Sequence, residues 1–161
     1  MRVVGCDPDT KALNVALIDT SAAERPGTLQ IRAKGKTAEA RLPLLVEAVE
    51  KWCADNADVD WVYIEKPTLQ RFGGKANVTS HDLQVIVLGV YLSAFVRFGI
   101  KHSIVDNMVW KRTLLGTGKA NKDDIKAWVL TAFPDLPTDE PQDLYDATAI
   151  AAYGRLVLQG H

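Results

Sequence analysis

The first apolar and polar residues of the chain predict a strand hairpin. Residues 2–6 and 14–18 are two short apolar runs, and the polar segment 7–11 separates them. Pro8 fixes its backbone φ, and aspartates such as Asp7 and Asp9 favour the local hydrogen bonds of turns. Two apolar runs this close together indicate an antiparallel pair. Asp7 is therefore expected at the carboxyl end of the first strand.

Three more segments have strand patterns. Residues 29–33 alternate apolar and polar positions, which predicts an edge strand and completes an antiparallel three-stranded meander. Residues 61–64 form a continuous apolar run of the kind found in buried parallel strands, and residues 102–105 are a further predicted strand. Glu65 directly follows the first of these runs, so a second carboxylate is expected at a strand tip.

Helical spacing of apolar residues marks the remaining elements. Asn121 is suited to an N-cap and Pro141 to a first helical position. The predicted helices span residues 38–56, 78–98, 109–115, 121–133 and 141–158.

The helix predicted at 78–98 is apolar on nearly all sides. Such a helix must be covered on both faces, and one sheet covers only one. We therefore expect a homodimer formed through this helix. Leu88, Leu92 and Phe95 share a stripe at helical spacing and are the predicted interface residues.

Composition is that of an ordinary globular protein. The chain has 161 residues, 47% hydrophobic and 24% charged, which favours one domain spanning 1–161. Two cysteines are too few for a disulfide framework or a zinc site. No secretion signal and no apolar run of membrane-spanning length is recognisable, so we expect a cytoplasmic protein without membrane partners.

The charges are unevenly distributed along the chain. Residues 66–122 contain nine Lys or Arg against two Asp or Glu, a net +7, while the whole chain has a net charge of −1. A basic middle between acidic ends is typical of a protein with one face toward phosphate. Chance clustering on a solvated surface is the alternative.

The segment 66–77 combines cations, glycines and one aromatic ring. Arg71, Phe72 and Lys75 suit contacts with unpaired bases, although an ordinary surface loop fits equally well. The later run Gly116-Thr117-Gly118-Lys119 is not a Walker phosphate loop, because Thr113 and Ala120 stand where that pattern needs Gly and Ser or Thr.

Four carboxylates lie at the ends of predicted elements: Asp7, Glu65, Asp143 and Asp146. Asp143 and Asp146 are three positions apart and share a helical face. Turn formation by Asp7 and a helix-dipole role for Asp143 are the simpler interpretations. If the four converge, they need a cation, and oxygen ligands select Mg²⁺, or Mn²⁺ as a substitute. Two such ions form the clamp used in phosphodiester cleavage.

Four pieces of the sequence, taken together, are fairly specific: residues 5–8 (GCDP), 62–65 (VYIE), 110–122 (WKRTLLGTGKANK) and 141–151 (PQDLYDATAIA). On these pieces, which occur in family order, the chain resembles the RuvC family of Holliday junction resolvases, which have a ribonuclease H-like fold. The resemblance implies an α/β fold with a mixed five-stranded sheet, an antiparallel meander plus parallel strands, flanked by helices. Asp9 and Asn14 stand where the family commonly has glycine. Phe72 lies further along the chain from the strand that ends at Glu65 than the aromatic residue that the family has in this loop.

The resemblance also assigns roles. It implies that Asp7, Glu65, Asp143 and Asp146 bind two Mg²⁺ ions and catalyse cleavage. The expected DNA-binding residues are Lys111, Lys122, Arg71, Phe72, Lys75, Lys119 and Arg112. The implied function is a dimeric, Mg²⁺-dependent endonuclease that resolves four-way DNA junctions by symmetric nicks. The alternatives are a non-catalytic binder of branched DNA and, with less support, an ATPase or small-molecule kinase of the same fold.

Overall fold

A five-stranded mixed sheet forms the centre of the protein, in the order β3-β2-β1-β4-β7. The computed structural model describes residues 1–21, 25–68, 71–72, 75–76 and 78–160. The strands of the main sheet are β1 (Arg2–Pro8), β2 (Ala12–Asp19), β3 (Gly27–Arg32), β4 (Trp61–Glu65) and β7 (His102–Val105). β1, β2 and β3 are antiparallel, whereas β4 is parallel to both β1 and β7. The predicted meander, parallel strands and edge position of β3 are confirmed.

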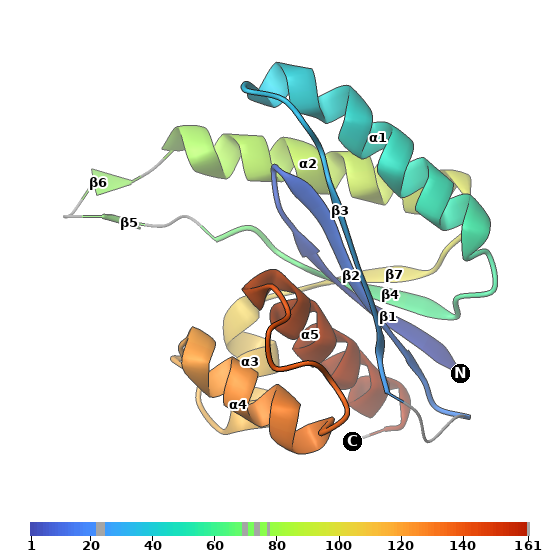
Figure 1. Ribbon diagram of the computed structural model, residues 1–161, viewed down its shortest axis with the longest axis vertical. Helices are drawn as coiled ribbons and strands as arrows, with labels where there is room; N and C mark the ends of the chain where they lie inside the picture. Colours follow the sequence, from blue (N-terminus) through green and yellow to red (C-terminus); the bar gives the residue numbers. More distant parts are fainter. Residues whose placement is uncertain (22–24, 69–70, 73–74, 77, 161) are drawn as a thin grey trace.

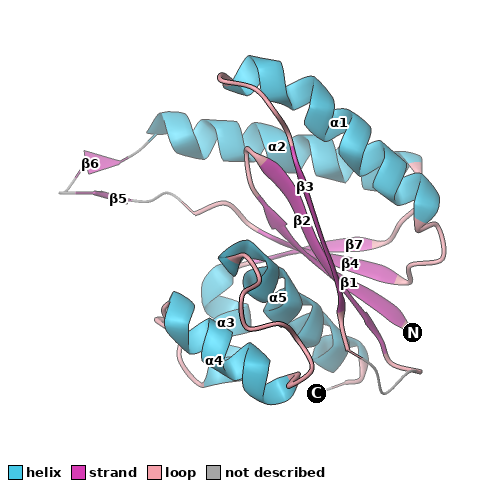
Figure 2. Cartoon of the chain, in the orientation of Figure 1, coloured by secondary structure: helices cyan, strands magenta, loops and turns pink. Residues whose placement is uncertain are grey.

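Helices cover both faces of the sheet (Figures 1 and 2). Over one face lie α1 (Ala38–Asp55) and α2 (Val78–Arg97). The opposite face is covered by α3 (Asn107–Leu115), α4 (Lys122–Ala132) and α5 (Gln142–Leu158). Asn121 forms the predicted N-cap of α4, with a reciprocal bond from its backbone to Asp124. Asp106 caps α3, which therefore begins two residues before its predicted start.

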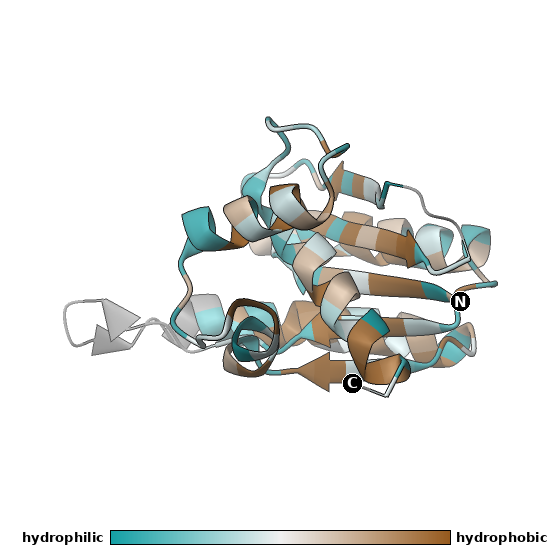
Figure 3. Cartoon of the chain, turned by 90° about the horizontal axis from the view of Figure 1, so that it is seen from below, coloured by the Kyte–Doolittle hydropathy of each residue, from teal (hydrophilic) through white to brown (hydrophobic). Residues whose placement is uncertain are grey.

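Two hydrophobic cores follow from this layering, because successive side chains of a strand point to opposite faces. Val4 and Cys6 of β1 pack with α1 and α2, whereas Val3 packs with Tyr63 and the residues of α3, α4 and α5. Figure 3 shows hydrophobic residues concentrated along the central strands. Both cysteines are free and buried.

Small residues let α5 lie directly on β1. A Cβ atom added at Gly5 would come within 2.0 Å of the Ala147 carbonyl oxygen and 2.3 Å of the Ala151 nitrogen. Gly154 is similarly close to the Tyr63 ring. This close approach fixes the height of α5 over the sheet, and with it the position of the aspartates in its first turns.

The structure corrects the predicted interface residues on α2. Leu88 and Phe95 are buried in the core that β1, β2, α1 and α2 share, and Leu92 packs against the same core. Periodicity could not separate the inward from the outward stripe on a helix that is apolar all round. Among the side chains of α2 that the structure describes, the exposed apolar ones are instead Val85 (46%), Ile86 (51%) and Val96 (68%).

Two other expectations change. The segment predicted as a loop contains a short antiparallel pair, β5 (Arg71–Phe72) and β6 (Lys75–Ala76), separate from the main sheet. Pro141 is the residue before α5 rather than its first helical position. Among the described helices, none combines the length and the apolar character needed to cross a membrane.

Candidate metal centre

Three of the four candidate carboxylates converge at one end of the sheet. Asp7 near the end of β1, and Asp143 and Asp146 from the first turns of α5, each place one oxygen within 4.8 Å of the others. The parallel register that pairs Cys6 with Ile64 brings Glu65, at the end of β4, beside Asp7. Close packing of α5 on Gly5 completes the group. The predicted convergence is confirmed for this trio, and Glu65 lies at its side.

A cleft of about 290 Å³ opens over these carboxylates. Its lining is polar and draws on both strand tips, α2, α3, α4 and α5. The cleft is lined by Asp7, Pro8, Asp9, Glu65, Lys66, Pro67, Thr68, Gln84, Asn107, Trp110, Lys111, Lys122, Ile125, Asp143 and Asp146. Strand tips are where α/β proteins commonly place their ligand sites.

Glu65 is positioned by Trp110. The fully buried indole donates a hydrogen bond from Nε1 to Glu65 Oε2, at 2.9 Å. Burial raises the pKa of Glu65 to about 7, although the indole hydrogen bond opposes the rise and the charge of Asp146 adds to it. Glu65 is therefore a carboxyl that resists ionisation until a cation approaches.

Asp7 and Asp146 are in a similar environment. Burial, followed by the charges of Glu65, Asp146 and Asp143, raises the pKa of Asp7 well above its ordinary value. Burial also raises the pKa of Asp146, against the opposing charge of Lys122. Carboxylates this close cannot all ionise cheaply without added positive charge.

Lys122 supplies part of that charge. Its Nζ lies 3.5 Å from Asp146 Oδ2 and 3.7 Å from Asp143 Oδ1. Burial lowers the pKa of Lys122, but the charges of Asp146 and Asp143 outweigh it and the net direction is upward. The lysine stays cationic and exposed at the cleft, where a phosphate can reach it.

The other predicted DNA-binding residues divide into three groups. Lys111 lines the cleft, with its Nζ 5.4 Å from the centre of the Trp110 ring. Arg112 and Lys119 are exposed and lie outside the described lining. The side chains of the remaining predicted residues, Arg71, Phe72 and Lys75, lie outside the part of the chain that the structure describes. Gly116 is the left-handed C-cap of α3, with φ 76°, which agrees with the rejection of a phosphate loop.

Sequence reasoning missed two supporting residues and left the position of a third open. Gln142 donates from Nε2 to Asp146 Oδ1 at 3.1 Å and to the Lys122 carbonyl at 3.3 Å, which joins α5 to the start of α4. Trp110 stands in the sequence only as part of a motif, and nothing in its spacing indicates a bond to Glu65. Asp9 lines the cleft, and burial together with the charge of Asp143 raises its pKa.

A chain of side-chain hydrogen bonds crosses the meander toward Asp7. Arg32 Nε donates to Gln30 Oε1 at 2.9 Å, and Gln30 Nε2 donates to Asn14 Oδ1 at 2.7 Å. Fully buried Asn14 then donates from Nδ2 to the Asp7 carbonyl at 3.4 Å. The backbone that carries Asp7 is thus supported from the edge strand, with an asparagine where the resembled family commonly has glycine.

The donor set fits a hard divalent cation. The trio offers only carboxylate oxygens, and the described residues bring no histidine or cysteine into the cleft lining. Oxygen-only ligation is typical of Mg²⁺ and Mn²⁺ rather than Zn²⁺. A cation would also relieve the mutual repulsion that raises the pKa of Asp7.

The sheet order and the carboxylates at its strand tips define an α/β protein of the ribonuclease H-like class. A family model described as crossover junction endodeoxyribonuclease RuvC matches residues 3–153. The chain therefore belongs to the RuvC family.

Curated relatives agree with this assignment. The chain is 26% identical over 155 residues to crossover junction endodeoxyribonuclease RuvC of Paenarthrobacter aurescens (strain TC1), covering 94% of this chain and 79% of the relative. The RuvC of Parafrankia sp. (strain EAN1pec) is 28% identical over 157 residues, covering 94% and 84%.

Two structures of Thermus thermophilus RuvC share the fold. One has a TM-score of 0.75 at 22% identity, covering 99% of this chain and 97% of the other. The second is in complex with a Holliday junction substrate and has a TM-score of 0.79 at 21% identity, covering 99% and 95%.

Proposed function

We propose that this protein is a Mg²⁺-dependent endonuclease that resolves four-way DNA junctions. The convergence of Asp7, Asp143 and Asp146 within 4.8 Å, with Glu65 beside them, is the observation that carries the proposal. Membership of the RuvC family supports the junction as substrate. A binder without catalysis would gain only repulsion by placing four carboxylates against phosphate.

The carboxylates of the cleft and the residues that support them have separate roles in this function. Asp7, Asp143, Asp146 and Glu65 would hold one or two Mg²⁺ ions, which supply charge stabilisation at the reacting phosphate and favour deprotonation of water. Trp110 keeps the Glu65 carboxylate in one orientation through its indole N–H. Gln142 does the same for Asp146. Lys122 and Lys111 offer cations to the DNA backbone at the mouth of the cleft.

The function is tested with labelled four-way junctions and matched linear duplex. With Mg²⁺ the protein should nick two symmetry-related strands of the junction and leave the duplex intact, and EDTA should stop the reaction. Asp146→Asn removes a ligand and should abolish nicking, whereas Asp135→Asn, an exposed loop residue, should not. Equal cutting of duplex and junction would refute junction selectivity, and hydrolysis of ATP without DNA cleavage would favour the kinase-like alternative.

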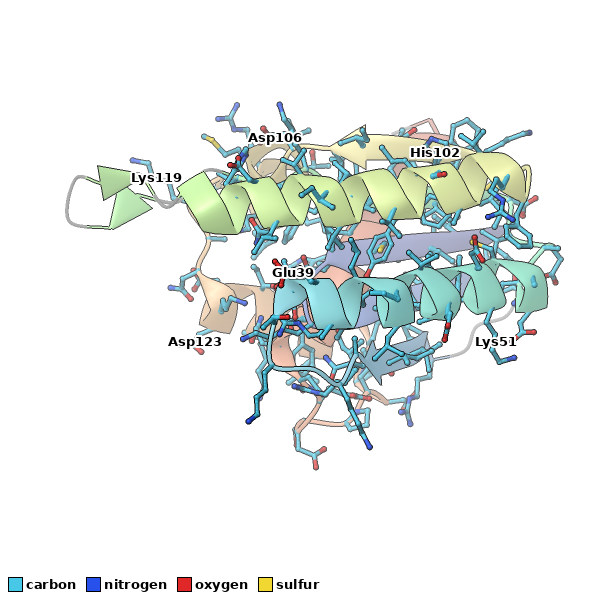
Figure 4. The ribbon with its side chains drawn as sticks, turned by 90° about the horizontal axis from the view of Figure 1, so that it is seen from above. Glu39, Lys51, His102, Asp106, Lys119 and Asp123 are labelled. Carbon is cyan, nitrogen blue, oxygen red and sulfur yellow. The ribbon has the colours of Figure 1, made fainter. Side chains whose placement is uncertain are left out.

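We also propose a homodimer, formed through the outer face of α2. Val85, Ile86 and Val96 are exposed apolar residues of this face, with exposed Gly89 between them. Their spacing follows one side of the helix for three turns, so two copies would bring the same apolar patch together in an isologous contact. Figure 4 looks onto α1 and α2 side by side, so this outer surface is open in the single chain.

The dimer is tested by sedimentation of the protein at micromolar concentration. Ile86→Glu or Val96→Glu should convert a dimer into a folded monomer, because each places a charge in the centre of the contact. Val157→Glu on α5 replaces a similarly exposed valine (41%) elsewhere and should leave the dimer intact. A monomeric unmodified protein that still nicks both strands together contradicts the proposal.

A further inference from the structure

Within the described part of the first 65 residues, acidic side chains lie at both ends of the sheet, but a group of unpaired lysines lies at only one of them. Acidic side chains lie at the amino end of β1, where Asp19 pairs in register with Arg2 and Asp60 accepts a hydrogen bond from the Arg2 backbone at 2.7 Å. At the carboxyl end of β1, Asp7 and Asp9 line the cleft, whereas the β1–β2 turn and the segment after β3 carry lysines. Lys11, Lys34 and Lys36 are exposed there and are called the N-terminal basic patch.

The carboxylates at the amino end of β1 are largely neutralised by their own neighbours. Arg2 forms an ion pair with Asp58, and the terminal amine lies 3.8 Å from Asp19. Lys51 pairs with Asp55 at 2.7 Å. This end of the sheet therefore has little charge left for a partner.

The N-terminal basic patch is not neutralised in this way. Within the described part of the chain, none of its three lysines has a carboxylate within 4.0 Å. Exposed Arg32 adds a fourth cation, and Glu39 is the one acidic residue in the sequence from 30 to 41. Unpaired cations in a cluster repel one another, so they stabilise a complex with a polyanion more than they stabilise the free protein.

The backbone that carries the patch is held rigidly. Arg41 donates from Nε to the Thr10 carbonyl and from Nη1 to the Gly35 carbonyl, both at 3.0 Å. The Ala33 amide donates to the Lys11 carbonyl at 2.8 Å. These bonds join the β1–β2 turn to the segment before α1, so the lysines project from a preformed surface.

The patch and the metal centre lie at the same end of the sheet, the carboxyl end of β1. Lys11 follows Asp7 by four residues, and Asp9 between them lines the cleft. A DNA strand whose phosphate enters the cleft must continue over the adjoining surface, and here that surface is basic. The net charge of this part of the sequence does not reveal the basic patch. The first 65 residues have eight Lys or Arg against eleven Asp or Glu, a net charge of −3.

We propose that the N-terminal basic patch binds DNA phosphates outside the cleft, as a second contact surface in addition to Lys111 and Lys122. The inference rests on the proposed function, since it assumes a DNA substrate. Each bound phosphate releases counterions, so each contributes about 0.9 to the salt slope of binding. These interactions carry no sequence information, and they anchor an arm of the substrate while the cleft holds the cleaved strand.

The test compares salt titrations of junction binding in EDTA, where no cleavage occurs. The variant is Lys11→Ala, Lys34→Ala and Lys36→Ala together, and its slope should fall by about 0.9 for each phosphate that it no longer binds. Arg32 is left unchanged, because its bond to Gln30 supports Asp7 through Asn14. Replacing Lys34 and Lys36 by arginine should keep the slope of the unmodified protein.

The matched control is Lys51→Ala with Lys101→Ala. Both lysines are exposed and lie toward the opposite end of the sheet, and Figure 4 shows Lys51 near the end of α1, far from Lys119 and Asp123. The control should leave the slope unchanged. A triple variant with the slope of the unmodified protein overturns the inference while junction cleavage still stands. Failure of the unmodified protein to bind junctions overturns the proposed function instead.

Discussion

Replacing Glu65 by glutamine should stabilise the metal-free protein at neutral pH while it removes nuclease activity. Burial holds the pKa of Glu65 near 7, about 2.5 above the ordinary value of 4.5. One pKa unit corresponds to about 1.4 kcal/mol, so ionising Glu65 costs the folded protein about 3 kcal/mol. Glutamine avoids this cost, and its carbonyl oxygen can still accept the Trp110 indole hydrogen bond.

The sign of the pH dependence follows from the raised pKa. Below pH 4.5 the carboxyl is protonated in both folded and unfolded protein, so the variant and the unmodified protein should be equally stable. Between pH 4.5 and 7 the folded protein binds more protons than the unfolded chain, so the free energy of unfolding of the unmodified protein falls as pH rises. The difference between the two proteins should grow across this window and level off above it.

Urea denaturation in EDTA at pH 4, 6 and 8 measures this difference. Glu47→Gln replaces an exposed glutamate of α1 and should show no comparable change. Added Mg²⁺ should stabilise the unmodified protein by about 2.7 kcal/mol at one hundred times its dissociation constant, and the variant much less. A Glu65→Gln difference that stays the same from pH 4 to pH 8 would refute the electrostatic reasoning.

Three further predictions concern the same cleft. Asp7→Asn removes a metal ligand and should therefore abolish Mg²⁺-dependent nicking. The substitution also removes one negative charge from the cleft, so gel-shift titration in EDTA should show that junction binding survives. Gly5→Ala should lower the free energy of unfolding by about 3 kcal/mol in urea denaturation, because the added Cβ meets the Ala147 carbonyl. The control Gly27→Ala should change this free energy little, because no atom lies within 4 Å of a Cβ added there. Trp110→Phe removes the N–H that favours ionised Glu65, so the pKa of Glu65 should rise and the acid limb of the rate profile should move to higher pH.

Much of the fold could be predicted because its elements have strong periodic signals. The runs at 2–6 and 61–64 have the continuous apolar character of buried strands, and each ends at a carboxylate. The helix boundaries were accurate where a cap is local in sequence, as at Asn121. The carboxylates could be placed from local sequence too. A residue that ends a strand lies at the strand tip, and two residues three positions apart share one face of a helix, whatever the helix packs against.

The remaining features depend on contacts between distant segments. The hydrogen bond from Trp110 to Glu65 joins residues 45 positions apart, and no local pattern encodes it. The outward stripe of α2 could not be chosen because Leu88 and Val85 are equally apolar and only packing separates them. The N-terminal basic patch was hidden for a similar reason, because its cations lie in a net-acidic stretch of sequence whose carboxylates are spread over both ends of the sheet.

The central claim is that the carboxylates of β1, β4 and α5 bind a catalytic divalent cation. The most direct measurement is a crystal structure of this protein soaked in Mn²⁺, with anomalous scattering used to locate the ion. We predict an anomalous peak in contact with Asp7 and with Asp143 or Asp146, and its loss in Asp146→Asn. A cleft without an anomalous peak at a Mn²⁺ concentration that supports nicking, or an ion bound elsewhere, would contradict it.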